Sequence, residues 1–126
     1  MTRLRRTAIL SFFLFVLTWP LGAASLKVAP GRFMIQNVAP GRHYDVYKET
    51  GVRLTIYNDD PTTRSWLLST HRPSERGRWE TGYGEIPDAD WCWFSEPSVT
   101  VPPGDVAHAY LHIRVPEEDR YYNQHW

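Results

Sequence analysis

Apolar and polar residues alternate with a period of two in several short segments of this chain, and no long segment repeats apolar residues at helical spacing. In residues 52–57, every second side chain from Val52 onward is aliphatic, and the segment ends at the turn-forming sequence Asn58-Asp59-Asp60-Pro61. The strongest pattern covers Ala107–Val115, where apolar residues share one face of an extended chain and polar or aromatic residues share the other. This alternation predicts an all-β fold.

Shorter patterns predict five more strands, at Phe33–Val38, Tyr44–Tyr47, Ser65–Thr70, Trp91–Phe94 and Ser98–Val101. Turn-forming sequences separate them at Pro40-Gly41, Thr50-Gly51 and Pro102-Pro103-Gly104. About seven short strands punctuated by Gly and Pro are typical of an antiparallel β-sandwich. The segment His71–Asp90 is a predicted loop of 20 residues. A loop of that length in a compact domain is either functional or contains structure that the pattern does not reveal.

Residues 1–24 have the three zones of a secretory signal peptide, and we expect them to form a signal helix. A basic zone around Arg5 precedes a mostly apolar zone, Thr7–Leu21, and the small residues Gly22-Ala23-Ala24 follow. The apolar zone is too short to span a bilayer comfortably. We therefore predict cleavage before Ser25 and a periplasmic or secreted protein. The alternative is an uncleaved anchor, which would be the chain's only membrane contact.

The mature chain, residues 25–126, has the length of one domain. It keeps 11 basic and 14 acidic residues, and this net charge of −3 argues against a nucleic-acid partner. Cys92 is the only cysteine, so no intramolecular disulfide can form. The mature chain also holds 14 of the 18 aromatic Phe, Trp and Tyr residues, so we expect packing of large rings to supply much of its stability.

The aromatic residues of the 71–94 region are the candidate binding residues. They could form an exposed platform for a sugar ring or a protein partner, or they could form a small core under the loop. The candidates are Trp79, Tyr83, Trp91 and Trp93.

Residue spacing gives little support to metal binding or catalysis, and we expect no cofactor. His108 and His112 lie four residues apart on a predicted strand, about 13 Å between Cα atoms, which is too far for one ion. His43, His71 and His125 have no partner at zinc-site spacing. The long loop carries Glu85, Asp88 and Asp90, which could offer oxygen atoms to Ca²⁺, but the EF-hand pattern is missing.

The sequence also lacks the usual signs of a hydrolase. Cys92 has no neighbouring signature that would lower its pKa, and it is expected to be a small apolar core residue. No G-x-S-x-G sequence is present, and no acid pair is evident across a groove.

Three runs, SLKVAPGRFMIQNVAPGRHYDVY, VRLTIYND and VTVPPGDVAHAYLHIRVPEE, resemble bacterial extracytoplasmic immunoglobulin-like modules related to the PapD-like and major-sperm-protein group. The shared features are a first strand carrying a proline, a V-x-P-G turn at Val38–Gly41, an Asn closing a strand at Asn58, and a Pro-Gly turn before a long penultimate strand. The resemblance implies an immunoglobulin-like sandwich for residues 25–126. It does not imply an activity.

The chain departs from that group in two respects. Pilus chaperones have two such domains and a basic pair that anchors a client's carboxylate, whereas this chain has one domain and no such pair that we can place. After Val115 the modules continue into a last strand, whereas Glu117–Trp126 is a polar and aromatic tail. We therefore expect a sandwich lacking its last strand, either because the chain is truncated or because another chain completes the sheet.

Together these observations predict a non-catalytic extracytoplasmic module that binds or scaffolds through protein–protein contacts, with a client strand at an open sheet edge as one form of partner. The alternative is a carbohydrate-binding module that uses the aromatic residues of the 71–94 region. A third hypothesis is a small metal-dependent hydrolase.

Overall fold

The computed structural model describes residues 26–32, 34–77 and 80–126. The predicted signal peptide over residues 1–24, Ser25, Phe33 and Trp79 lie outside the described residues. Short strands dominate, with two one-turn α-helices and two 3₁₀ turns. In chain order the elements are β1 (Leu26–Ala29), β2 (His43–Asp45), α1 (Val46–Thr50), β3 (Leu54–Asn58), β4 (Arg64–Leu67), α2 (Pro73–Arg76), η1 (Ala89–Trp91), β5 (Cys92–Phe94), β6 (Ser98–Val101), β7 (Val106–Ala109), β8 (Leu111–Arg114) and η2 (Asp119–Tyr121). None of the helices in this part of the chain has the length and apolar character needed to cross a membrane.

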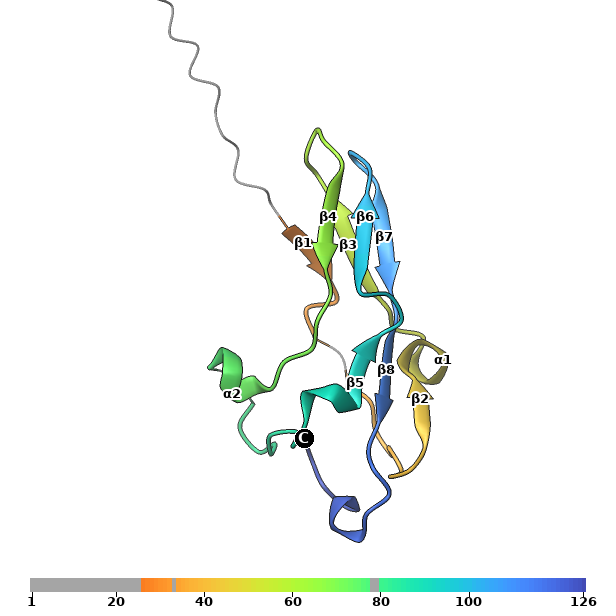
Figure 1. The fold of residues 1–126 in the computed structure, drawn as a ribbon, viewed down its shortest axis with the longest axis vertical. Coiled ribbons are helices and arrows are strands. Elements are labelled where there is room, and N and C mark those ends of the chain that lie inside the picture. Colours follow the sequence, from red (N-terminus) through yellow and green to blue (C-terminus); the bar gives the residue numbers. More distant parts are fainter. Residues whose placement is uncertain (1–25, 33, 78–79) are drawn as a thin grey trace, which may run out of the picture.

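The strands form three small antiparallel sheets, so the predicted all-β, antiparallel class is confirmed (Figure 1). One sheet has the order β1-β3-β7, and a two-stranded sheet pairs β4 with β6. These two lie in the upper half of the view in Figure 1. The third sheet, β2-β8-β5, lies below them.

The two upper sheets share a hydrophobic core. Ile56 of β3, Ala109 of β7 and Val101 of β6 are buried against one another, with 0–4% of their surface exposed. Partly buried apolar side chains surround them, namely Leu54, Trp66, Leu68, Phe94, Val99 and Ala107. Because Ile56 and Val101 come from different sheets, this core is what holds the two sheets face to face.

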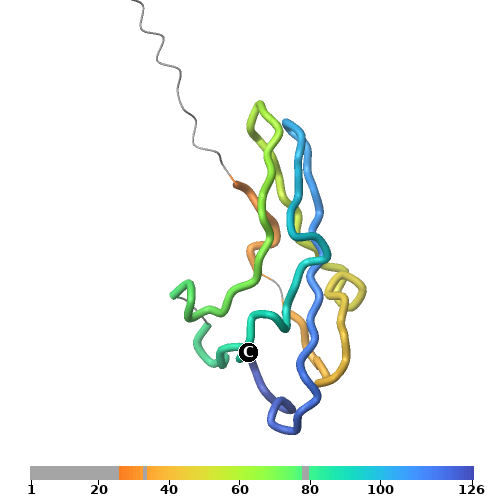
Figure 2. Tube along the Cα trace, viewed as in Figure 1, coloured from red at the N-terminus to blue at the C-terminus, as the bar shows by residue number. Residues whose placement is uncertain are grey.

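The predicted strand Ala107–Val115 is divided at Tyr110 into β7 and β8. Figure 2 shows this part of the chain running through both halves of the structure. β7 pairs with β3, whereas β8 pairs with β2 and β5, so one extended segment serves two sheets. The Tyr110 carbonyl accepts the Ser95 N–H at 2.9 Å where the pairing changes. The predicted apolar side of this segment is buried both before and after Tyr110, since Ala109 and Val115 are both buried.

Two predicted strands are wrong in whole or in part. Residues 34–38 form no strand. The predicted strand Tyr44–Tyr47 ends at Asp45, because the Asp45 carboxylate accepts the N–H groups of Tyr47 and Lys48 at 3.1 and 3.2 Å and so caps a helix there. Helix α1 then ends at Gly51, whose φ of 73° is accessible to glycine at low cost.

The other predicted strands are observed with shifted ends. The segment 52–57 corresponds to β3, Ser65–Thr70 to β4 and Trp91–Phe94 to β5, while β6 coincides with the predicted Ser98–Val101. The predicted 20-residue loop contains α2 and leads into η1.

Candidate functional site

The solvent-facing side of the β2-β8-β5 sheet carries a group of ring side chains from three separate segments. Trp93 on β5 lies directly opposite His112 on the central strand β8. His43 lies on β2, which pairs with the other side of β8. The opposite side of the sheet buries Tyr44. We call His43, Trp93, Ser95 and His112 the His–Trp patch.

The side chains of the His–Trp patch are in direct contact. The Nε2 atom of His43 lies 3.0 Å from Nδ1 of His112, and the Ser95 hydroxyl oxygen lies 2.5 Å from Nε2 of the same ring. The Trp93 ring stacks on both imidazoles, with centroid distances of 5.3 Å to His43 and 5.6 Å to His112. Trp93 is 38% exposed, so the patch is open to solvent.

At the contact between the two imidazoles, one ring nitrogen donates a hydrogen bond and the other accepts it through its lone pair. The order Ser95–His112–His43 is that of a nucleophile, a base and an orienting group in hydrolases. It is also the order of a second-sphere hydroxyl, one imidazole ligand and a second imidazole ligand at a metal site. Both of these roles depend on the short distance between the ring nitrogens of His43 and His112.

A second candidate site is the outer edge of β4. No further strand pairs with β4 in the described ranges 26–32, 34–77 and 80–126. In an antiparallel pair, every second residue forms backbone hydrogen bonds to the neighbouring strand. The Leu68 N–H donates to the Pro97 carbonyl at 2.8 Å, so Leu68 is one of the residues that bond toward the β6 side. It follows that the backbone groups of Trp66 point to β6, whereas those of Ser65 and Leu67 point away from it. The Leu67 side chain is 88% exposed.

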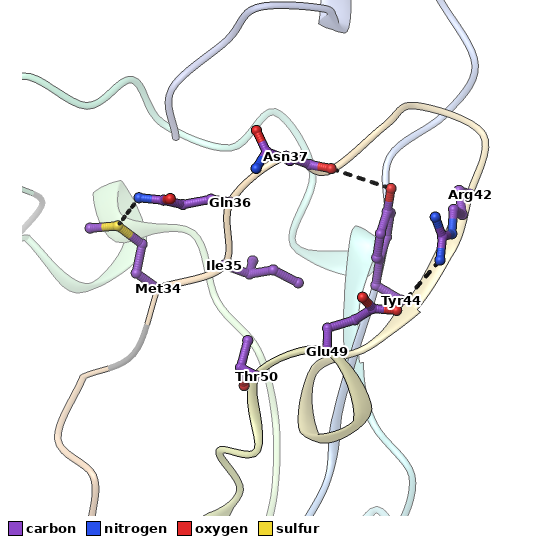
Figure 3. Close-up of a pocket in the computed structure, with 8 residues that line it drawn as sticks. All are labelled: Met34, Ile35, Gln36, Asn37, Arg42, Tyr44, Glu49 and Thr50. Carbon is purple, nitrogen blue, oxygen red and sulfur yellow. Dashed lines mark hydrogen bonds and ion pairs between the residues drawn. The ribbon is translucent and has the colours of Figure 1, made fainter.

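A surface pocket of about 460 Å³ lies where residues 34–37 pass β2 and α1 (Figure 3). The Arg42 guanidinium lies 4.8 Å from the centroid of the Tyr44 ring and 3.6 Å from the Glu49 carboxylate. Tyr44 donates its hydroxyl to the Asn37 carbonyl at 3.5 Å. The two charged side chains that line this pocket are thus paired with each other, and the Tyr44 hydroxyl is bonded to the backbone, so we assign the pocket no ligand.

Glu85 organises the long loop between β4 and β5. Its carboxylate accepts the Ser74 N–H in the first turn of α2 at 2.7 Å and bonds to the Arg72 guanidinium at 2.6 Å. Hydrogen bonds from Ser74 are the main cause that lowers the pKa of Glu85, and the charge of Arg72 acts in the same direction. Asp88 accepts the Asp90 N–H at 2.8 Å. The carboxylates of Glu85 and Asp88 thus accept hydrogen bonds from other groups of the protein. No cluster of three metal-ligating side chains occurs in the described part of the chain.

Comparisons with known protein families, with curated proteins and with solved structures find no match to this chain. The function is therefore inferred from the geometry of these sites.

The aromatic residues predicted to form a platform belong to different surroundings. Trp93 is part of the His–Trp patch, whereas Trp91 packs edge-on against Tyr121 and Trp126, with centroid distances of 4.7 and 5.7 Å. Tyr83 is half-buried. Trp79 lies outside the described residues. Whether these residues bind a ligand stays a prediction.

The C-terminal tail packs against the same loop. The Gly84 N–H donates to the His125 carbonyl at 2.7 Å, and Tyr121 and Trp126 complete the ring cluster around Trp91. Residues 119–121 form the 3₁₀ turn η2. This cluster is the arrangement expected if Trp91 helps to form a small core under the loop.

Sequence spacing missed the His–Trp patch because its members are far apart in the chain. His43 and His112 are 69 residues apart and meet only through the register of β2 on β8, in which Asp45 lies opposite His112. The alternation correctly places His112 on the polar side of its strand, but it carries no information on which strand lies beside it. Cys92 is half-buried, and burial raises the pKa of its thiol, which makes a nucleophilic role harder.

Proposed function

We propose that this chain is an extracytoplasmic immunoglobulin-like β-sandwich of the PapD-like and major-sperm-protein-like kind that binds a protein partner and carries out no catalysis. Supporting features are the antiparallel sheets, the end of β3 at Asn58 and the turn at Gly104, which has a φ of 69°. The signal-like sequence of residues 1–24 supports export from the cytoplasm.

The outer edge of β4 is the observation that carries the proposal. Ser65 and Leu67 direct backbone N–H and C=O groups away from β6 that have no partner among the described residues, and an edge of this kind is a template for a strand from another protein. Within β4 itself, the only charged residue is Arg64, whose side chain is bonded to Asp60 at 2.8 Å. The middle of the edge thus lacks the charges and prolines that commonly block strand addition. The exposed Leu67 side chain offers an apolar contact to the added strand.

The proposed partner is therefore an extended peptide segment with alternating apolar and polar residues. A fluorescent peptide of eight such residues, titrated against purified untagged protein, provides the probe. Leu67→Lys should weaken binding by placing a charge on the edge. Ser65→Pro should abolish it, because proline removes the outward N–H without breaking a bond to β6.

Leu26→Lys is the matched control, since Leu26 is a 55% exposed apolar residue on the edge strand of another sheet. Equal binding by the parent protein and all three variants would show that the β4 edge is not the site. Light scattering during the titration separates peptide capture from pairing between two copies of the chain.

Carbohydrate binding is the second candidate function, and the exposure of Trp93 favours it. An exposed indole can stack on a sugar ring, and the neighbouring His43, His112 and Ser95 side chains could bond to hydroxyl groups. Trp93→Ala should abolish glycan binding if this function is correct. Binding that survives this substitution would exclude the His–Trp patch as the sugar site.

A further inference from the structure

We propose that His43 and His112 form a two-imidazole site for a divalent transition-metal ion, with Cu²⁺ as the preferred ion. This inference goes beyond the proposed function and does not depend on it, because the site lies on the β2-β8-β5 sheet, away from the β4–β6 ladder. It also departs from the expectation of no metal site, which rested on spacing along the chain. The observation behind it is the 3.0 Å separation between His43 Nε2 and His112 Nδ1.

That separation matches two nitrogen ligands of one ion. Imidazole nitrogens bind at about 2.0–2.1 Å from a metal, so two of them lie about 2.9 Å apart at a right angle and about 3.3 Å apart at a tetrahedral angle. The observed 3.0 Å is closer to the right angle. Cu²⁺ favours square-planar nitrogen coordination and stands highest among the first-row divalent ions in affinity for such ligands.

The surroundings of His112 are those of a metal ligand. A histidine that binds a metal through one nitrogen usually donates its other N–H to a neighbouring acceptor, which fixes the ring. Ser95 supplies such an acceptor, with its hydroxyl oxygen 2.5 Å from His112 Nε2. This bond leaves Nδ1, the atom that faces His43, as the free ligand atom. Trp93 stacks on both rings and holds their orientation.

Protons balance when the ion binds. In the metal-free pair, one ring nitrogen donates and the other accepts, so a single proton lies between the two rings. The metal binds both nitrogens from beside the line that joins them, the proton moves to the other nitrogen of the same ring, and both imidazoles stay neutral. No third His, Cys, Asp or Glu joins the pair within residues 26–32, 34–77 and 80–126. Water therefore fills the remaining coordination positions, and these are open to an added ligand.

The charges on this face do not oppose a cation. Asp45 lies opposite His112 and Arg114 lies opposite His43, so one acidic and one basic residue flank the pair on the same side of the sheet. Arg114 is exposed, and its long side chain can turn toward water.

The test is titration of the purified, untagged full chain with a copper(II) salt in a non-coordinating buffer. We expect one Cu²⁺ per chain, nitrogen couplings in the electron paramagnetic resonance spectrum, and quenching of tryptophan fluorescence. His43→Ala and His112→Ala should each weaken binding by about tenfold or more, and Ser95→Ala by about tenfold. Trp93→Phe should keep the affinity and reduce the quenching. Zn²⁺ should bind more weakly than Cu²⁺.

His108→Ala is the matched control, because His108 lies on β7 and bonds to the Thr55 hydroxyl at 3.2 Å, in a different sheet. It should leave copper binding unchanged. If His112→Ala fails to fold, His43→Ala, a change at an exposed position, decides the question. Absence of stoichiometric Cu²⁺, or equal affinity in the parent protein and His43→Ala, would overturn the proposal.

Discussion

Asn58 is a buried polar residue whose bonds join two loops to the core. It is 1% exposed, and its amide nitrogen donates to the carbonyls of Thr62, Val101 and Pro102 at 2.8, 2.8 and 3.2 Å. Its side-chain oxygen accepts the Asp60 N–H at 3.0 Å. The Asn58 side chain thus forms hydrogen bonds with three backbone carbonyls and one N–H near the ends of β3 and β6.

Replacing Asn58 should therefore destabilise the fold strongly. Asn58→Ala removes four hydrogen bonds made by a buried side chain, and we expect a loss of about 2–4 kcal/mol in the free energy of unfolding. Asn58→Asp should cost at least as much, because a carboxylate cannot donate to the three carbonyls. Urea unfolding of both variants measures the loss. As a control, Asp59→Ala changes the exposed neighbour of Asn58, and a similar loss in that variant would contradict the role given to the Asn58 side chain.

Glu85 makes stability depend on pH in a definite direction. Hydrogen bonds from Ser74 and the charge of Arg72 hold the pKa of Glu85 below its ordinary value in the folded protein. A carboxyl group with a lowered folded-state pKa stabilises the fold above its unfolded-state pKa, and this contribution is lost as the pH falls through the folded-state pKa.

Glu85→Gln should accordingly lower the melting temperature at neutral pH, and the difference from the parent protein should disappear in acid. Thermal unfolding of both proteins between pH 7 and about pH 3 tests this. The control is Glu96→Gln at an exposed position, which should show a smaller, flatter difference. A Glu85→Gln difference that stays constant down to the lowest pH would contradict the assigned ion pair and hydrogen bonds.

At the scale of the elements, alternation predicts strands well where one side of the strand faces the core. β6 is observed at its predicted bounds, and β3 buries Ile56 on the side that the pattern assigns to the core, together with Asn58, which the sequence places at the start of the following turn. In both cases the apolar side chains contact the same cluster around Val101. Burial thus enforces the period of two that the sequence displays.

Local capping explains where alternation fails. The segment from Tyr44 onward alternates, yet Asp45 caps the next N–H groups, and a one-turn helix replaces the rest of the predicted strand. Val46 still becomes buried, at 1% exposed, because the helix places it against the third sheet. An Asp before a short apolar segment was the available signal for this helix.

Strand register explains why the candidate sites could not be predicted. The contact between His43 and His112 requires β2 to pair with β8 in one particular alignment, and neither sequence segment encodes its partner. The free edge of β4 is likewise a property of sheet order. Residue patterns along the chain predict which segments are strands and which side of each strand is buried. Which strands lie side by side, and which strand has a free edge, is set only when the chain folds.

At the scale of the whole molecule, three small sheets leave several strand edges without a neighbour. The sheet orders β1-β3-β7, β2-β8-β5 and β4-β6 contain eight strands, and the described chain has no closed sheet among them.

The tail after β8 makes a 3₁₀ turn, and its His125 carbonyl accepts the Gly84 N–H of the long loop. The extended segment after β4 bonds to the same loop through Thr70, which donates to the Ala89 carbonyl at 3.1 Å. The tail and β4 are thus both tied to the loop that joins α2 to β5.

The sequence predicts that the missing strand would lie beside Ala107–Val115, but β8 already pairs with β2 on one side and β5 on the other, so the open edge to be tested is that of β4. We append eight residues of alternating apolar and polar character after Trp126, joined by a flexible Gly-Ser linker long enough to reach from the lower half of the structure to β4 (Figure 1). If an added strand can pair with β4, it should satisfy the outward groups of Ser65 and Leu67, raise the melting temperature and favour the monomer.

The control extension has the same length and consists of Gly and Ser, which cannot supply an apolar strand face. Thermal unfolding and light scattering of the three proteins at matched concentration give the comparison. Combining the strand extension with Ser65→Pro should cancel the gain, because the added strand then loses a backbone donor on β4. If the unextended chain is already a stable monomer and the alternating extension behaves like the Gly-Ser control, the β4 edge does not accept a strand, and the hypothesis of an incomplete sheet is wrong.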